Sequence, residues 1–287
     1  MDLQLLANNH IYDNGKAGFL RTIEVLQQAG VTYTGARASE QESQYLLADI
    51  NGIQVGILNY TYEVEHEGER KSVNGNIMET SVENNLNSFE LSDIESFYEE
   101  VGQLRTELYA KGAEFILMYI HWGNEYELQQ NSTQETIAQR LCDIGIDAVI
   151  GGHPHVVQPV DVLVSSDGAH KMFCAYSLGN HLSNQRREKI SSRPNGHTED
   201  GLMITLTLAR TSGQVSISGI EAVPTYVYKT NQPRYYVIPI YQVEGIEEQT
   251  GLQGIQPVIQ SSYERTMNVL GTSLEDARRA LGIAVEY

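Results

Sequence analysis

The sequence contains no run of about eighteen or more apolar residues, the length that a membrane-spanning helix needs. Its amino terminus also lacks the basic and then apolar order of a secretory signal. Cysteine is scarce: Cys142 falls in a helical pattern and Cys174 in a strand pattern, and their spacing matches neither a metal pair nor a redox motif. We therefore expect no membrane span and two buried free thiols, and the cysteines give no information on the compartment.

Positive charge is scarce as well. The chain has 19 lysine and arginine residues against 37 aspartate and glutamate residues, which gives a formal net charge of −18. Acidic residues gather between Glu63 and Glu100, where most of them are typical of a solvated face. Because such a field repels polyanions, we expect no nucleic-acid partner. An anionic polymer would have to dock where metal ions or a local basic patch reverse the charge.

What the sequence does have is a regular alternation of strand and helix patterns. At 287 residues with 41% hydrophobic content, the chain can bury a sizeable core. Strands are predicted at 3–7, 45–50, 53–58, 114–118, 146–150, 160–164, 172–178, 202–208, 215–220 and 235–240, and helices at 92–111, 256–270 and 274–281, with two more that end near 30 and 145. The pattern predicts an α/β fold with a parallel region followed by an antiparallel region.

Local signals fix several boundaries. Asn51 and Gly52 are the preferred pair for a two-residue hairpin turn. The segment Ser132-Thr133-Gln134-Glu135 reads as a capping box that begins a helix, and Gly145 ends that helix. Residues 68–87 are polar and aperiodic, so we expect a loop there, and Pro239 favours an edge position for the strand at 235–240.

Three predicted strands end in asparagine or histidine. The strand at 3–7 leads into Asn8-Asn9-His10, the strand at 114–118 leads to His121, and the strand at 146–150 leads into Gly151-Gly152-His153-Pro154-His155. In open α/β sheets the ligand crevice lies at the carboxyl ends of the strands, so these segments are predicted to converge. Imidazoles there are typical metal ligands, although the last segment alone is also compatible with a tight turn bearing two surface histidines.

Four blocks of the chain resemble the bacterial capsule synthesis proteins of the CapA or PgsA type, within the calcineurin-like metallophosphoesterase superfamily. The blocks are Ala7-Asn8-Asn9-His10 with Asp13 and Gly15, His121-Trp122-Gly123-Asn124-Glu125-Tyr126, Gly152-His153-Pro154-His155-Val156-Val157-Gln158, and Tyr176-Ser177-Leu178-Gly179-Asn180. The resemblance implies a four-layer α/β/β/α sandwich. We expect this domain at 1–244, incomplete at its amino terminus, and a packed helical appendage at 245–287.

The resemblance also implies a metal site. Asn9, His121 and His153 would serve one ion and His155 a neighbouring ion, so that the chain holds one or two divalent ions, either manganese, iron or zinc. The upstream carboxylates that bridge the ions in this family have no counterpart before Asn9, and we interpret Glu125 as a carboxylate at the rim of the site or behind a ligand.

Two further roles follow from the resemblance. His10 would lie beside the leaving-group oxygen and act in catalysis. Asp13 either orients His10 or caps the helix that follows, and the sequence leaves both alternatives open.

Substrate contacts are predicted further along the chain. Ser177, Gly179 and Asn180 would face the substrate, and the basic cluster that contains Arg186 and Arg187 would receive an anion. That cluster also includes Lys189 and Arg193, and its alternative is a solvated loop. His181 is either an extra ligand or a polar substitution, and Trp122 either paves a cleft or lies in the core.

The resemblance predicts a capsule biosynthesis protein, concerned with poly-γ-glutamate, that hydrolyses a phosphoester by metal-activated water. The alternative is a non-catalytic accessory protein that binds the glutamyl polymer or membrane synthase subunits, and a lesser one is a partial reading frame that folds only in part. From the family, we expect a location in the cell envelope or outside the cytoplasm.

Overall fold

A computed structural model describes residues 2–66, 70–190, 195–232 and 234–284. The contacts of the chain divide it into two compact units. The first comprises Met1–Trp122, Ile137–Ile150 and Val164–Met172, and the second comprises Gly123–Thr136, Gly151–Leu163 and Phe173–Tyr287. The predicted α/β class is confirmed, because strands and helices alternate through the first half and an antiparallel sheet follows. The stacking of four layers stays a prediction.

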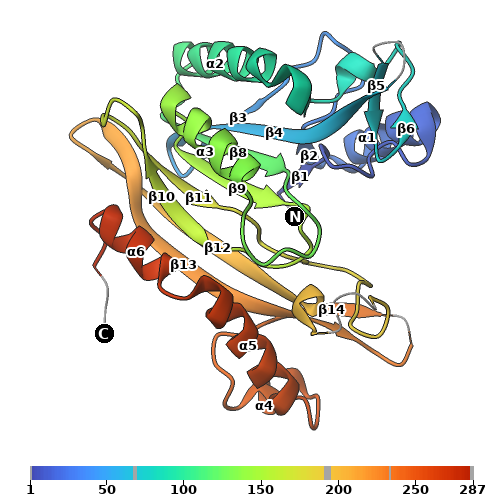
Figure 1. The fold of residues 1–287 in the computed structure, drawn as a ribbon, viewed down its shortest axis with the longest axis vertical. Coiled ribbons are helices and arrows are strands. Elements are labelled where there is room, and N and C mark those ends of the chain that lie inside the picture. Colours follow the sequence, from blue (N-terminus) through green and yellow to red (C-terminus); the bar gives the residue numbers. More distant parts are fainter. Residues whose placement is uncertain (1, 67–69, 191–194, 233, 285–287) are drawn as a thin grey trace. The chain divides into compact units, whose positions relative to one another are not determined.

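The first unit begins with a strand, a helix and a parallel strand (blue in Figure 1). Strands β1 (Leu3–Leu5) and β2 (Thr32–Thr34) pair in parallel, and α1 (Gly15–Ala29) connects them. The apolar positions of α1 recur at helical spacing, and Phe19 and Ile23 on that face are fully buried. The helix ends at Gly30, which adopts the left-handed conformation that glycine tolerates best.

The predicted hairpin is confirmed. Strands β3 (Leu46–Ile50) and β4 (Ile53–His66) are antiparallel, and Asn51 and Gly52 both have positive φ, 53° and 84°. Strand β4 also pairs in parallel with β8 (Phe115–His121), and β9 (Ala148–Gly152) lies next to β8 in the sheet. The parallel pairing brings Thr61 of β4 beside His121, the last residue of β8.

Residues 70–87 contain more regular secondary structure than the polar sequence predicted. They contain the antiparallel strands β5 (Arg70–Val73) and β6 (Asn76–Ile77) and a short 3-10 helix (Glu83–Asn85), and residues 67–69 lie outside the described part. The prediction of a loop was wrong because the two strands are too short for an alternating pattern to emerge. Asn74 and Gly75 make the turn, with φ of 50° and 75°.

Helix α2 (Ile94–Ala110) is the next long element of the chain. After β7 (Ser88–Glu90) and a 3-10 turn (Leu91–Asp93), α2 buries Phe97, Val101, Leu104 and Leu108 on one face, as the sequence predicted.

The helix α3 (Ser132–Ile144) begins where it was expected, but its capping differs by one residue. Asn131 is the cap: its Oδ1 accepts the Gln134 N–H at 2.9 Å, and Gln134 Oε1 accepts the Asn131 N–H at 3.0 Å.

The second unit contains long antiparallel strands. Its strands are β12 (Asp200–Thr211), β13 (Gln214–Lys229) and β14 (Tyr235–Pro239), and its helices are α4 (Ile246–Thr250), α5 (Gln256–Leu270) and α6 (Ser273–Ala280), with a 3-10 turn at His197–Glu199. Strands β10 (Val160–Val164) and β11 (Lys171–Ala175) each have residues in both units. Strand β14 pairs only with β13 in the order β12-β13-β14, so its predicted edge position is confirmed.

The carboxy-terminal helices pack on this sheet. Helices α5 and α6 contact β13 (red beside orange in Figure 1), and Ile246, Ile255 and Ile259 share a buried cluster with Tyr226 and Ile238. The described part of residues 245–284 therefore contributes to the core of the second unit. The predicted domain boundary after residue 244 stays a prediction. Among the described residues, no helix is both long enough and apolar enough to cross a bilayer.

Candidate metal centre

In the first unit, Asn9 and His121 lie in contact. The Asn9 side chain is 4% exposed, and its Oδ1 lies 3.0 Å from His121 Nε2. Buried Asn59, in the middle of β4, fixes the segment before Asn9 because its Oδ1 accepts the Ala7 N–H at 2.8 Å. Strand β8 carries His121 to the same place, where its ring stacks on Tyr62 with an interplanar angle of 11°. The structure thus joins two of the predicted metal ligands, which lie 112 residues apart in the sequence.

His10 and Asp13 form a second pair in this unit. His10 Nδ1 lies 2.7 Å from Asp13 Oδ2, and Asn74 Nδ2 donates to Asp13 Oδ1 at 3.0 Å. The hydrogen bond from Asn74 is the main reason that the pKa of Asp13 lies below its ordinary value; burial opposes it, and the contact with His10 adds to the lowering. The cap position of α1 belongs to Asn14, without a side-chain cap bond. The alternative that Asp13 caps the helix was therefore wrong, and its contacts favour orientation of His10.

The second unit holds the other two predicted ligands in a strained loop. His153 and His155 have φ of 95° and 60°, a region that side chains with a Cβ seldom adopt. Such backbone costs about 1–3 kcal/mol per residue and persists where surrounding contacts enforce it. One of these contacts ties the loop to the segment after β8, since Tyr126 N–H donates to the Pro154 carbonyl at 2.8 Å.

A network around Asn180 determines how His155 presents its nitrogens. Asn180 Nδ2 donates to the carbonyls of His155 and Thr198 and to Gln185 Oε1, at 2.9–3.2 Å. Three oxygen acceptors fix the amide orientation, so Asn180 Oδ1 is left to accept from His155 Nδ1 at 3.0 Å. Neutral His155 is then protonated on Nδ1, and its Nε2 offers a lone pair. Asn180, predicted as a substrate contact, instead orients a predicted metal ligand.

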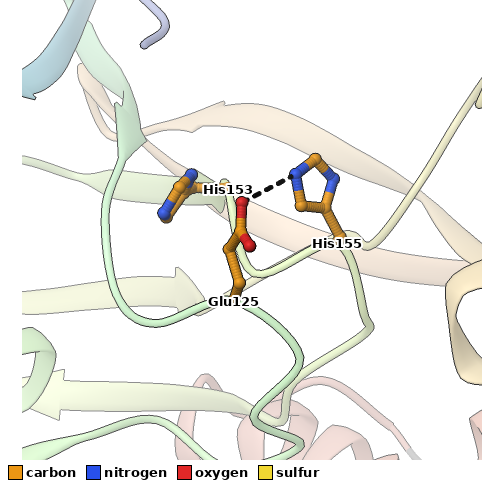
Figure 2. Close-up of side chains that lie close together, drawn as sticks. All are labelled: Glu125, His153 and His155. Carbon is orange, nitrogen blue, oxygen red and sulfur yellow. Dashed lines mark ion pairs between the residues drawn. The ribbon is translucent and has the colours of Figure 1, made fainter. Parts of the chain in front are cut away.

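Glu125, which the sequence did not assign as a ligand, lies beside the two predicted ligands of this unit. Ligand atoms of Glu125, His153 and His155 all lie within 4.8 Å of one another, and Glu125 Oε1 is 3.7 Å from His155 Nε2. Figure 2 shows the Glu125 carboxylate between the two imidazole rings. Two ligands of one tetrahedral ion, each about 2.1 Å from it, lie roughly 3.4 Å apart. The donor set and its spacing therefore fit a divalent ion.

Ser177 and Gly179 shape the loop beneath this group. Ser177 is buried, and its hydroxyl donates to the Val156 carbonyl at 2.8 Å, so a substrate contact by Ser177 is not supported by this geometry. Gly179 has φ of 69°, and a Cβ there would lie 2.8 Å from the Asp200 carbonyl oxygen. Glycine is required at this position because two backbone segments approach each other closely.

Arg186 and Arg187 do not stand free in solvent. Arg187 makes a paired contact with Glu199 Oε2 through Nε and NH2, at 3.1 and 2.8 Å, and Arg186 NH2 lies 3.4 Å from Glu199 Oε1. Tyr226 and the Val227 carbonyl also accept from Arg186. The alternative of a solvated basic loop therefore does not hold for Arg186, which is largely buried, whereas Arg187 is paired but stays exposed. Of the other members of the predicted cluster, Lys189 is exposed and Arg193 lies outside the described residues.

Both arginines still border a cavity of about 450 Å³ in the second unit, together with Tyr226 and α5 residues Pro257, Val258 and Ser261. A role in receiving an anion stays a prediction.

Trp122 and His181 lie outside the groups of predicted ligands. Trp122 is buried, as the core alternative predicted, and exposed His181 lies outside the Glu125–His153–His155 group. The predicted ligands thus form two groups: Asn9 with His121 in the first unit, and His153 with His155 in the second. That the two groups share one centre stays a prediction. Sequence reasoning missed Glu125 as a ligand, although its place four residues after His121, in a block that carries the resemblance, was a signal.

Comparison with known families decides the relationship. The model of the bacterial capsule synthesis protein family PGA_cap matches residues 1–185, more than half of the chain. The chain belongs to this family.

Two curated relatives agree with the assignment. The capsule biosynthesis protein CapA of Bacillus anthracis is 28% identical over 199 residues, which cover 68% of this chain and 44% of that protein. The PGA biosynthesis protein CapA of Bacillus subtilis is 26% identical over 181 residues, 62% of this chain and 42% of that protein. The chain therefore spans less than half the length of either relative.

Solved structures give more distant matches. The calcineurin-like phosphoesterase YfkN of Bacillus subtilis is 15% identical, with a TM-score of 0.40, over 97% of this chain and 72% of that one. The sulfate thiohydrolase SoxB of Thermus thermophilus is 13% identical, with a TM-score of 0.41, over 93% and 36% of the two chains. Likeness at this level carries no conclusion about activity.

Proposed function

We propose that this chain acts in capsule biosynthesis at the cell envelope, where it binds a divalent ion through Glu125, His153 and His155 and hydrolyses a phosphoester. Membership of the capsule synthesis family supports the first part. The printed name of one relative, a PGA biosynthesis protein, supports poly-γ-glutamate as the polymer concerned. The geometry of the second unit supports the metal site.

The observation that carries the metal site is the approach of His155 Nε2 to Glu125 Oε1, at 3.7 Å. With Nδ1 donating to Asn180, neutral His155 turns a lone pair on Nε2 toward a carboxylate oxygen, which is also an acceptor. Two acceptors facing each other are compatible with a proton on the ring, a bridging water or a metal ion between them. His153 brings a third donor within 4.8 Å of both, which favours the metal ion.

The ion would supply a Lewis acid and an activated water for attack on phosphorus. Mixed nitrogen and oxygen ligands suit manganese, iron and zinc alike, so we propose one of these three. Asn180 and the strained loop hold the imidazoles ready, because a ligand already in its rotamer loses less entropy on binding. Asn9 and His121 would serve a second ion or the same one.

His10 has the second role in the proposal. It would donate a proton to the leaving-group oxygen from Nε2, since Nδ1 is held by Asp13.

Metal titration and a phosphatase assay test the proposal together. We expect about one manganese ion per chain by elemental analysis. Glu125→Gln and the double variant His153→Ala, His155→Ala should each weaken manganese binding by more than the ~10–100-fold that loss of a group behind a ligand costs. His181→Ala removes an exposed histidine outside the group and serves as the control. Equal phosphatase rates in the double variant and the unmodified chain would remove the catalytic claim.

A second candidate function is non-catalytic binding of the glutamyl polymer or of membrane synthase subunits. The cavity of about 450 Å³ bordered by Arg186 and Arg187 favours it, because Arg187 remains 42% exposed and guanidinium groups suit carboxylates. Binding of poly-γ-glutamate that is lost both on chelation and in Arg187→Gln would support this candidate. Absence of binding under every condition would count against it.

A further inference from the structure

The hairpin β5–β6 brings Asn74 against the His10–Asp13 pair. Asn74 Nδ2 donates to Asp13 Oδ1 at 3.0 Å and lies 3.1 Å from His10 Nδ1. The other carboxylate oxygen, Asp13 Oδ2, is the one 2.7 Å from His10 Nδ1. An amide nitrogen only donates, and so does His10 Nδ1 when it carries the ring hydrogen, so the hydrogen bond of Asn74 here is to Asp13 Oδ1, which leaves Asp13 Oδ2 for the imidazole. Asn76 lies farther away, with its Nδ2 at 3.4 Å from Asp13 Oδ1.

Turn geometry alone would also explain an asparagine at this position. Asn74 has φ of 50° and is followed by Gly75, so the pair makes a hairpin turn of the kind that favours Asn-Gly. The hairpin β3–β4 has the same two residues, Asn51 and Gly52, with φ of 53° and 84°. The chain therefore contains two equivalent turns, of which one directs its asparagine at a candidate catalytic pair.

A contribution to stability is a weak explanation for the contact. The side chains of His10 and Asp13 are 56% and 40% exposed, and Asn74 is exposed as well. Polar pairs at such exposure contribute little, because water competes and side-chain entropy is lost. Because stability does not account for these three hydrogen-bonded side chains, a functional role is the better explanation.

His10 also borders a space that could admit a ligand. A cavity of about 330 Å³ in the first unit is lined by His10 with Asn8 and Asn14, by Leu5 of β1, and by Gly18 and Thr22 of α1. A side chain that holds the His10 ring in one orientation therefore also determines what the ring presents to this cavity.

We propose that Asn74 is a positioning residue that fixes the Asp13 carboxylate and, through it, the orientation and tautomer of His10. The proposal deepens the proposed function, since it rests on His10 as the residue that donates a proton to the leaving group. Asn74 supplies the donor that keeps the carboxylate from rotating, and Asp13 then keeps the ring hydrogen on Nδ1.

The test separates the side chain from the turn. Asn74→Gly keeps a residue that accepts positive φ and removes the donor, and Asn74→Asp keeps the shape but places a second carboxylate against Asp13. We expect kcat for a chromogenic phosphomonoester to fall about tenfold in both, a fraction of the 10²–10⁴-fold that a positioned general acid contributes, with KM nearly unchanged. Asn51→Gly, at the equivalent turn, is the matched control and should leave kcat unchanged.

A nitrogen-15 spectrum of the imidazoles supplies a readout that does not need activity. At a pH where the ring is neutral, we expect the His10 signal, assigned by its loss in His10→Gln, to be that of the Nδ1–H tautomer. In Asn74→Gly it should move to the average of two tautomers, and in Asn51→Gly it should not move.

The two measurements have distinct failures. An inactive wild-type chain would overturn the proposed hydrolysis, and the tautomer shift would still decide the role of Asn74. The positioning role is overturned if Asn74→Gly retains the wild-type tautomer, or if Asn51→Gly changes the spectrum equally.

Discussion

Glu199 is the buried centre of a charged cluster. Its side chain is 1% exposed, and both Arg186 and Arg187 contact it. Burial alone would raise the pKa of this carboxyl, but the hydrogen bonds from Arg187 and the charges of both arginines outweigh burial and lower it. A lowered pKa means that the folded chain favours the ionised form. The cluster therefore stabilises the fold above the ordinary carboxyl pKa, and this contribution is lost as the pH falls through the lowered value.

Replacement of Glu199 tests this account. Glu199→Gln leaves two guanidinium groups without their buried partner, and we expect the free energy of unfolding near pH 7 to drop by about 3–5 kcal/mol. The difference from wild type should shrink in acid, where Glu199 itself becomes protonated. Unfolding measured between pH 7 and pH 3 checks the trend.

The matched control is Glu188→Gln, which removes an exposed partner of Arg186. It should change stability by less than about 1 kcal/mol, because exposed ion pairs contribute little. A Glu199→Gln penalty that stayed constant over the whole pH range would contradict the account.

At the scale of elements, Gly35 allows three strands to meet at the candidate site. Gly35 follows β2 with φ of 93°, and a Cβ there would lie 2.1 Å from Asn59 Oδ1 and 2.8 Å from the Ala7 nitrogen. Those two atoms form the hydrogen bond that links β4 to the end of β1. The segment that carries Asn9 to His121 is therefore held in place only because Gly35, just after β2, has no side chain.

The substitution Gly35→Ala should lower the free energy of unfolding by more than the strain of a positive φ alone explains. We expect a loss of stability at least about 2 kcal/mol greater than in Gly30→Ala, because displaced Asn59 would leave the buried Ala7 N–H without a partner. Gly30 also has positive φ, 66°, but a Cβ there meets nothing within 4 Å, so it isolates the backbone term. Thermal unfolding of both variants measures the difference, and equal losses would show that the packing at Gly35 is not tight.

Features that depend on residues close together in the sequence could be predicted, and features that depend on tertiary contacts could not. The hairpin at Asn51-Gly52, helix α2 and the three strand ends were predictable because short local patterns determine them. Strands β5 and β6 were missed, yet the signal was present: Asn74-Gly75 is the same dipeptide that identified the first hairpin.

The roles of single side chains were less predictable. Arg186 and Arg187 were predicted to receive an anion. Both instead form ion pairs with Glu199, and the local charge pattern does not reveal these contacts. Asn180 looked like a substrate contact, and its role depends on the tautomer of His155. Such roles arise from tertiary hydrogen bonds, whereas the family motifs only select which residue types are present.

At the scale of the whole molecule, the charge of −18 opposes the polymer that the family suggests. Repulsion between two polyanions acts over the Debye length, which is roughly 20 Å in 20 mM salt and about 8 Å in 150 mM salt. Added salt should therefore favour encounter with a polyanion and oppose encounter with a polycation.

We expect the affinity for poly-γ-glutamate, measured by fluorescence anisotropy with manganese present, to rise several-fold between 20 and 150 mM sodium chloride. Polylysine of similar length is the control, and its affinity should fall over the same range. Glutamyl polymer binding that weakens with salt would mean that a local basic surface dominates over the net charge.

Each compact unit contains one buried thiol that can report on its local opening. Cys142, on α3, belongs to the first unit and Cys174, on β11, to the second, and both are fully buried. Burial, together with the charge of Asp143, raises the pKa of Cys142 to about 11, so the reactive thiolate is scarce at neutral pH. The rates at which Cys142 and Cys174 are alkylated, followed by mass spectrometry, would thus measure how often each unit opens transiently, with no reporter group added.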